Sequence, residues 1–294
     1  MMNYIILDLE WDGAFYPKIG RFINQILQIG AVKLDGGFNI VDTFEKTIKS
    51  SFSKRVSKRF RELTGITKEE MLAGVSLSDA IEEYNNWVGD NAVTMTWSNS
   101  DIYTVIENEK ALVDVKFRIE KYLDLQKYIQ GEMRLRGIEC TSQISLLNAA
   151  NALNVKIDET VLHNARADSA ACAAILKECY DKERFSSFIT DTSDPDFFKK
   201  FSFKPHYIRD INDENIDKKA FEFSCEFCGR PLTRLNDWKS HNCGFFADMF
   251  CENCKKTFSA RVRFRKMYDC VKVRRNLFEK KPKNELKNGA KNDL

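Results

Sequence analysis

Apolar runs of strand length open the chain. Residues 3–10, 26–34 and 38–48 are rich in Ile, Leu and Val, and the glycines at 36–37 form a turn signal before the third run. Runs that follow each other through short connections pair as antiparallel neighbours. The pattern therefore predicts three consecutive antiparallel strands at the start of the protein.

Helical spacing of apolar residues takes over after residue 50. It predicts helices near 55–63 and from Ser78 through Trp87, and Thr67 with Glu70 forms a capping box for another. Later helical segments are expected at 101–110, 111–119, 125–135, 142–153 and 166–183, with short strands at 92–97 and 121–124. The order β-β-β-α-β-α-α indicates an α/β domain.

The periodicity fades in the last third of the chain. Residues 186–220 contain DTSDPD and DINDENID, which are typical of a linker packed irregularly on the body. We therefore expect a main domain over 1–185, a linker over 186–220, a small domain over 221–275 and a basic, disordered tail over 276–294.

Composition indicates a water-soluble globular protein. The 294 residues suffice for one large and one small domain, and 43% of them are hydrophobic. No apolar stretch approaches the roughly 18 to 20 residues that cross a bilayer, and the N-terminal segment lacks the features of a signal peptide. These observations predict a cytoplasmic location and no membrane association.

Charge is distributed unevenly along the chain. Residues 1–220 carry 29 Lys and Arg against 34 Asp and Glu, whereas residues 221–294 carry 17 against 9. A basic segment attached to an acidic body favours a polyanionic partner for that segment, although basic surfaces often do no more than keep a protein in solution.

Two carboxylates interrupt the first strand. In YIILDLEWD, Asp8 and Glu10 lie two residues apart, so they project from one side of the strand about 7 Å from each other. Buried anions of like charge are stable only beside a cation. The alternative is a strand end that emerges into water, where the two carboxylates do nothing.

Further polar candidates stand at expected helix starts. In SNSDIYTVIENE, Ser100 is expected to cap a helix that carries Asp101 in its first turn. In VLHNARADSAAC, His163 precedes Asp168 by five residues, a rotation of about 500° on one helix. We therefore expect His163 in the turn before the helix of Asp168. Taken singly, the two acids are also explained by the helix dipole, and His163 by a polar loop.

Together these residues resemble the motifs of the DEDDh family of 3′-5′ exonucleases. Asp8 and Glu10 match its Asp-x-Glu motif, Asp101 its second motif, and His163 with Asp168 its His-x4-Asp motif. The resemblance covers about residues 1–185 and extends to ILQIGAV in the second strand. It implies an RNase H-like fold, a mixed sheet flanked by helices, and is greatest for the ERI-like and KapD-like branch, which is associated mainly with RNA trimming.

The resemblance also implies a mechanism. Asp8, Glu10, Asp101 and Asp168 would hold two Mg²⁺ or Mn²⁺ ions, because hard divalent ions select carboxylate oxygens. His163 would take the proton from the attacking water. Trp11 departs from the small residue that many relatives have after Asp-x-Glu, so it either stacks on a nucleobase or packs in the core with Leu9.

Two Cys-x-x-Cys pairs mark the C-terminal segment. They lie in SCEFCGRPL and FCENCKKTF, 22 residues apart, and resemble the knuckles of a zinc ribbon. The predicted ligands of one structural Zn²⁺ are Cys225, Cys228, Cys251 and Cys254. His241 and Cys243 lie between the pairs, and either of them replacing one ligand is the alternative. The cysteines in apolar helical segments, Cys140, Cys172 and Cys179, are expected in the core.

A basic strand follows the second pair. In TFSARVRFRK, apolar residues alternate with Arg261, Arg263 and Arg265, which predicts a strand with one apolar and one cationic face. We interpret the cationic face as a site for nucleic-acid phosphates. The alternatives are an edge strand protected from aggregation by its charge and a ribbon that docks a protein partner.

The sequence thus predicts a metal-dependent 3′-5′ exonuclease that releases nucleoside 5′-monophosphates, with single-stranded RNA as the leading substrate. A DNA exonuclease in repair or proofreading is the same chemistry on another polymer. A hypothesis of a different class is a non-catalytic adaptor that binds nucleic acid through the zinc ribbon. The intact set of five signature residues argues against that adaptor.

Overall fold

The structure is a computed structural model that describes residues 3–140 and 143–280. The chain divides into two units, Met1–Ser202 and Phe203–Leu294, each of which is described by itself. No helix of the described residues is long and apolar enough to cross a membrane.

A six-stranded mixed sheet runs through the first unit in the order β3-β2-β1-β4-β5-β6. Its strands are β1 (Asn3–Tyr16), β2 (Arg21–Leu34), β3 (Ile40–Thr47), β4 (Ala92–Thr96), β5 (Lys121–Asp124) and β6 (Thr190–Asp191). The first three strands are antiparallel, as the sequence predicts, whereas β4 pairs parallel with both β1 and β5.

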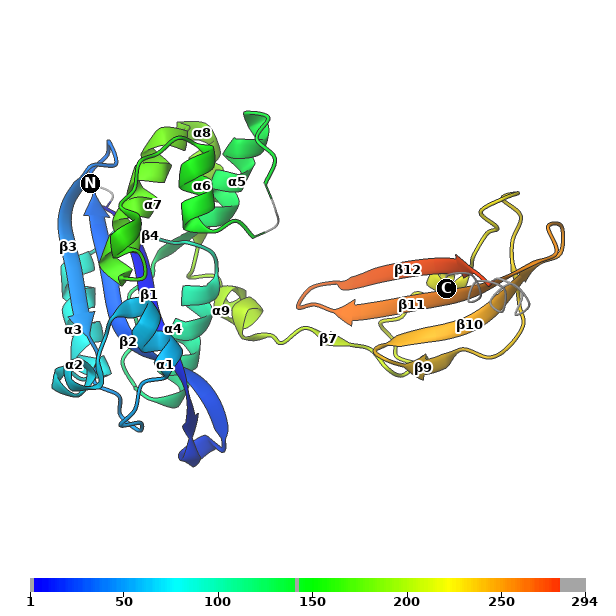
Figure 1. The fold of residues 1–294 in the computed structure, drawn as a ribbon, viewed down its shortest axis with the longest axis horizontal. Coiled ribbons are helices and arrows are strands. Elements are labelled where there is room, and N and C mark those ends of the chain that lie inside the picture. The colour runs from blue at the N-terminus through cyan, green and yellow to red at the C-terminus, as the bar shows by residue number, and fades with distance from the viewer. Residues whose placement is uncertain (1–2, 141–142, 281–294) are drawn as a thin grey trace, which may run out of the picture. The chain divides into compact units, whose positions relative to one another are not determined.

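Helices cover both faces of this sheet (Figure 1). They are α1 (Lys58–Thr64), α2 (Lys68–Ala73), α3 (Leu77–Val88), α4 (Ser100–Ala111), α5 (Leu125–Leu135), α6 (Leu146–Ala152), α7 (Ala165–Cys179), α8 (Lys182–Phe188) and α9 (Pro195–Ser202). The capping box at Thr67 is confirmed as the start of α2. Together with the sheet, these helices confirm the predicted α/β class and the RNase H-like arrangement.

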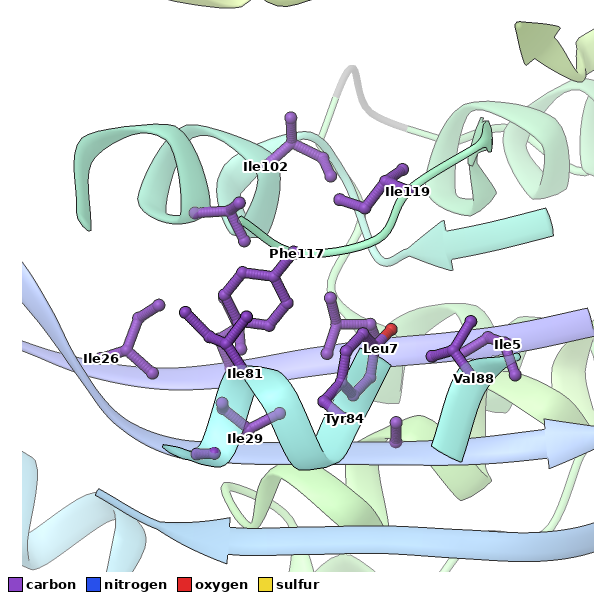
Figure 2. Packing of buried hydrophobic residues seen from close by; sticks show 14 of the residues in the cluster. Ile5, Leu7, Ile26, Ile29, Ile81, Tyr84, Val88, Ile102, Phe117 and Ile119 are labelled. Carbon is purple, nitrogen blue, oxygen red and sulfur yellow. The ribbon is translucent and has the colours of Figure 1, made fainter. Parts of the chain in front are cut away.

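The alternation of β1 divides its side chains between two cores. Ile5 and Leu7 belong to the cluster that packs under α3 and α4, and Figure 2 shows Tyr84 of α3 within this cluster. Ile6 belongs to the opposite cluster, formed with residues of α5, α6 and α7. Because side chains two apart share a face, Asp8 lies on the α7 side of the sheet with Ile6.

Several predicted elements differ from the structure. Strands β1 and β2 extend beyond the predicted runs and form a hairpin around the turn η1 (Pro17–Ile19). The sequence does not predict this extension, because apolar and polar residues alternate poorly at the tip of the hairpin. The predicted helix at 111–119 is wrong, since α4 ends at Ala111 and the following segment turns to place Phe117 in the core. Phe117 packs against Tyr84 of α3, with ring centroids 5.4 Å apart.

The predicted linker and tail also contain regular structure. Residues 186–220 include β6 and α9, whose Phe197 is buried in the core of the first unit, and the short strand β7 (His206–Tyr207) of the second. Strand β12 (Val271–Glu279) continues into the predicted tail, and residues 281–294 lie outside the described residues. Strands β6 and β7 have two residues each, too few to show a period, and α9 begins within DTSDPD, whose turn residues favoured a linker.

The second unit contains a sheet in the order β12-β11-β10-β8, with β9 paired to β10 and β7 to β11. Its further elements are η3 (Lys218–Phe221), β8 (Thr233–Arg234), β9 (Lys239–His241), β10 (Gly244–Cys251) and β11 (Lys256–Lys266). Phe258, Val262 and Phe264 of β11 are buried in its core, whereas the intervening arginines are not. The predicted alternation of the basic strand is therefore confirmed.

Candidate active site

Close packing of α7 against β2 brings the first and last sequence motifs together. Asp8 stands opposite Gly30 in the β1–β2 register. A Cβ atom on Gly30 would lie 2.2 Å from the backbone carbon of Ala165, the first residue of α7. Only glycine permits this approach, which brings the first turn of α7, with Asp168, next to Asp8.

Polar residues that the sequence analysis missed hold the start of α7 in place. The backbone N–H of Ala165 donates to Oε1 of the buried Gln28 at 3.1 Å, and the hydroxyl of Ser169 donates to the carbonyl of Gly30 at 3.2 Å. Glu45 on β3 accepts from Asn164 and Arg166. The available signal was Gln28, a polar residue within the apolar run ILQIGAV.

Asp101 reaches the same place through a gap between parallel strands. Strand β1 pairs with β4 only as far as Ile6, so the backbone N–H of Leu9 is free to donate to Asp101 Oδ1 at 3.1 Å. Asp101 lies in the first turn of α4, as predicted, but the N-cap is Asn99 instead of Ser100. The carboxyl ends of parallel strands are a common position for ligand sites in α/β folds.

His163 lies in the turn before α7, which confirms the expected position. Its φ of 69° is left-handed, a conformation that non-glycine residues rarely adopt and that clusters at functional sites. The backbone N–H of His163 donates to Asp168 Oδ2 at 3.3 Å. One ligand atom each of Glu10, His163 and Asp168 lie within 4.8 Å of one another.

The carboxylates repel one another in a buried site. Burial raises the pKa of Asp8 well above its usual range, and the charges of Asp101, Glu10 and Asp168 raise it further. Burial and the charge of Asp168 raise the pKa of Glu10 to about 8, and burial raises that of Asp101 to about 7. All four predicted acids therefore share one electrostatic site.

This site fits divalent cations. Oδ1 of Asp168 is buried without a hydrogen-bond partner, and like-charged carboxylates in low dielectric require a compensating charge. Hard oxygen donors of this kind select Mg²⁺ or Mn²⁺. Asp8, Glu10, Asp101 and Asp168 are the residues that can hold such ions.

Trp11 lies on the other side of β1. The register shifts between Glu10 and Trp11, and the partly buried indole packs against the core cluster that contains Leu7 and Leu9. This contact favours the core interpretation of Trp11 over stacking on a nucleobase.

Replacing Gly30 by Ala is expected to displace α7. The new methyl group would meet backbone atoms at 2.2 Å, and overpacking of this kind costs about 1–3 kcal/mol or more. We expect a lower melting temperature and weaker metal binding, measured by thermal unfolding and Mn²⁺ titration. Gly36→Ala is the matched control, because nothing lies within 4 Å of its added Cβ. Equal stability of the two variants would contradict the close approach of α7.

The acidic site should also make stability depend on pH. The unfolded chain loses protons near the ordinary values of 3.8 for Asp and 4.5 for Glu, whereas the folded, metal-free site keeps its protons until the higher pKa values of about 7 for Asp101 and about 8 for Glu10. The folded state then binds more protons, so its stability falls as pH rises from about 4 to about 8.

Thermal unfolding in Mg²⁺-free buffer tests this pH dependence. We expect the melting temperature of the first unit to fall as the pH rises from about 5 to about 8, the range in which the raised pKa values lie. Mn²⁺ should restore the melting temperature most at pH 8, because metal ligands must be deprotonated. The Glu10→Gln variant should show a flatter pH profile. A wild-type profile as flat as that of the variant would show that Glu10 titrates normally.

A second group of ligand-type side chains lies in the second unit. The Sγ atoms of Cys225 and Cys254 are 3.8 Å apart, and those of Cys228 and Cys251 are 3.6 Å apart. Four thiolates about 2.3 Å from a tetrahedral Zn²⁺ would be separated by about 3.8 Å. The cysteine cluster therefore fits zinc without rearrangement.

Backbone donors support this cysteine cluster. The backbone N–H of Arg230 lowers the pKa of the Cys228 thiol to about 7, and the N–H of Cys254 donates to Cys251 Sγ at 3.4 Å. His241 and Cys243 are not members of the cluster, so the alternative in which one of them replaces a ligand is not supported. The remaining predicted core cysteines, Cys140, Cys172 and Cys179, do pack in the first unit.

Known proteins resemble the first unit. A sequence model of the RNase_T family, described as exonuclease, matches residues 5–176. A PolC-type DNA polymerase III from Thermotoga maritima is 31% identical over 145 residues, 49% of this chain and 10% of that protein. A probable 3′-5′ exonuclease KapD from Bacillus subtilis is 27% identical over 111 residues, 36% of this chain and 52% of KapD. The chain thus spans about half the length of KapD and about a tenth of the PolC-type polymerase.

Solved structures share the fold. A full-length 3′-exonuclease superimposes with a TM-score of 0.53 and 16% identity over 66% of this chain and 91% of that chain. The nuclease domain of 3′hExo, a DEDDh family member bound to rAMP, gives a TM-score of 0.51 and 19% identity over 60% of this chain and 90% of that chain. These similarities confirm the predicted exonuclease fold.

Proposed function

The chain belongs to the exonuclease family RNase_T, and we propose that it is a metal-dependent 3′-5′ exonuclease that releases nucleoside 5′-monophosphates. One observation carries the proposal. Three segments far apart in sequence contribute Asp8 with Glu10, Asp101, and His163 with Asp168, and their carboxylates share one electrostatic site.

The roles of these residues follow from their chemistry. The four carboxylates would hold two divalent ions, which supply an activated water and neutralise charge on the leaving oxygen when bound. His163 is exposed in its turn beside Glu10 and Asp168, so its imidazole can accept the proton of the attacking water and release it to solvent. His163 has a left-handed backbone two residues before α7, and a ring nitrogen of it lies within 4.8 Å of a carboxylate oxygen of Glu10 and of Asp168.

Single-stranded RNA is the leading substrate, on the resemblance to the ERI-like and KapD-like branch. DNA is the second candidate, because PolC-type DNA polymerase III and a DNA polymerase III epsilon subunit of Aquifex aeolicus, 25% identical over 116 residues, are among the relatives. Both polymers present the same phosphodiester and a 3′ hydroxyl to the proposed site.

Turnover of end-labelled oligonucleotides tests the proposal. RNA and DNA of one sequence, labelled at the 5′ end, are incubated with the full chain and either Mn²⁺ or Mg²⁺. We expect a ladder of products that shorten from the 3′ end and a soluble nucleoside 5′-monophosphate. Faster shortening of DNA would select the second candidate. Intact oligonucleotides with either metal ion would favour the non-catalytic adaptor.

A further inference from the structure

The outward face of the second unit's sheet collects cations from three strands. The apolar residues that alternate with the arginines along β11 are buried, so the arginines project from the side of the sheet away from the core. The β-sheet register places residues of β9 and β12 on that same side. The cationic face consists of Lys239, Arg261, Arg263, Arg265, Lys272 and Arg274.

These cations oppose one another directly. Arg263 stands opposite Arg274 and Arg265 opposite Lys272 in the antiparallel register of β11 and β12. Like charges at directly opposed positions destabilise a sheet. A protein that keeps two such pairs gives up stability unless an anion lies over them.

No carboxylate within the described part of the chain neutralises the cationic face. None of its six cations forms an ion pair there, and the carboxylate that the register places on this side, Asp248, is paired with Lys280 at 2.6 Å. The Nε atoms of Arg261 and Arg263 are buried without a hydrogen-bond partner. Because the Nε atoms are covered, the terminal nitrogens of the two guanidinium groups are the donors that a phosphate would reach; one of those of Arg261 donates to the carbonyl of Asn242 at 3.5 Å.

Planar groups lie among the charges. The rings of His241 and Phe246 are stacked, with centroids 4.3 Å apart and an angle of 11° between planes. The guanidinium of Arg261 lies 4.9 Å from the centroid of Phe246, and that of Arg265 lies 5.9 Å from that of Tyr207. Exposed rings and guanidinium planes are surfaces on which nucleobases stack.

We propose that this cationic face binds single-stranded nucleic acid, with the cations on its phosphates and His241 and Tyr207 beneath its bases. A single strand fits better than a duplex, because paired bases hide their faces in their own stack. The choice of nucleic acid as the polyanion rests on the proposed exonuclease function. Binding itself requires neither a 3′ end nor the acidic site.

A circular single-stranded oligonucleotide separates the two sites, because it offers no 3′ end to an exonuclease. Binding of a fluorescent 30-mer circle (about twice the largest site size of one small binding domain) to the full chain is measured by anisotropy in Mg²⁺-free buffer. In the variant Arg261→Gln/Arg263→Gln/Arg274→Gln, we expect Kd to rise at least about tenfold. The log-log salt slope should fall by about 2, as for three lost single-strand phosphate contacts.

The matched control removes three cations outside this face. Lys218, Lys219 and Arg230 are exposed, and the segment of the two lysines packs through Ala220 on the apolar side of the sheet. Their triple Gln variant changes net charge equally and should bind the circle as wild type does. Equal Kd values and salt slopes for the two triple variants would overturn the proposal.

A second variant tests the stacking surface. At pH 8, His241→Ala should weaken binding of the circle about fivefold or more, because stacking contributes about 1–3 kcal/mol per base, while leaving the salt slope unchanged. Unchanged affinity, or tighter binding of a duplex of equal length, would contradict a single-strand surface. If the protein proves to lack exonuclease activity, the circle can still bind to the cationic face. If the cationic face proves not to bind the circle, the acidic site can still cleave dinucleotides.

Discussion

Asp8→Ala abolishes phosphodiester cleavage if the acidic site is catalytic. Asp8 is the carboxylate whose pKa is raised by burial and by all three other acids, so its removal takes away an acid that interacts with every other acid of the site. We expect turnover of a 5′-labelled oligonucleotide to fall by more than the about 10²- to 10⁴-fold that a general base contributes. Asp168→Ala should have the same effect through the loss of its unpartnered Oδ1.

Stability separates loss of catalysis from loss of folding in these variants. Neutralising Asp8 removes repulsion from the metal-free site, so its melting temperature should remain equal or rise. The rise that Mn²⁺ causes in wild type should disappear. Asp90→Ala is the control, because Asp90 is exposed and pairs with Arg118 away from the cluster. An Asp8→Ala protein that folds, binds Mn²⁺ as wild type does and cleaves would refute the assignment.

His163→Ala should behave differently from the acid variants. His163 is proposed to move a proton, whereas the acids hold the metal, so this variant should retain the Mn²⁺-dependent rise in melting temperature. Its turnover should fall about 10²- to 10⁴-fold, and binding of a short oligonucleotide should be largely unchanged. Wild-type turnover in His163→Ala would exclude a general base at this position.

The double variant Cys225→Ser/Cys228→Ser is expected to unfold the second unit. A structural Zn²⁺ contributes about 10–16 kcal/mol of apparent binding free energy, which matches or exceeds the stability of a typical domain, about 5–15 kcal/mol. The core of this unit includes Cys225 and Cys251 themselves. Metal analysis should show the loss of one zinc per chain, and protease cleavage should begin within the second unit.

The first unit should survive this change, because we propose that the two units are separate domains. The oligonucleotide circle should no longer bind, whereas dinucleotide cleavage should persist. Cys243→Ser is the matched control, since Cys243 lies outside the cysteine cluster and contacts Arg209 at 3.9 Å. Retention of zinc and of the protease pattern in the double variant would show that these cysteines are not the ligands.

The candidate residues could be found in the sequence because each motif is local. Strand alternation places Asp8 and Glu10 on one side, helical rotation places His163 before α7, and the knuckle spacing identifies all four clustered cysteines. Patterns of two to five residues report directly on the geometry of a single strand, turn or helix start. Resemblance to a family then supplied the order of the motifs and the fold.

Features that join distant segments could not be predicted in this way. The course of the chain after Ala111 and helix α9 depend on where Phe117 and Phe197 find space in a core formed by other elements, and the hairpin tip depends on the pairing of β1 with β2. Tertiary packing, and not the local pattern, decides the conformation of such segments.

Sequence by itself determined which side chains are the candidates for chemistry and on which side of their own element they lie. Tertiary structure alone decided what they meet: α7 approaches Asp8 because Gly30 lacks a side chain, and Arg263 opposes Arg274 because of the β11–β12 register. A strand's face follows from its own alternation, but its register and neighbours are set by burial and hydrogen bonds across the whole sheet. For that reason the three arginines of β11 were visible in the sequence, whereas the cationic face across β9, β11 and β12 required the fold.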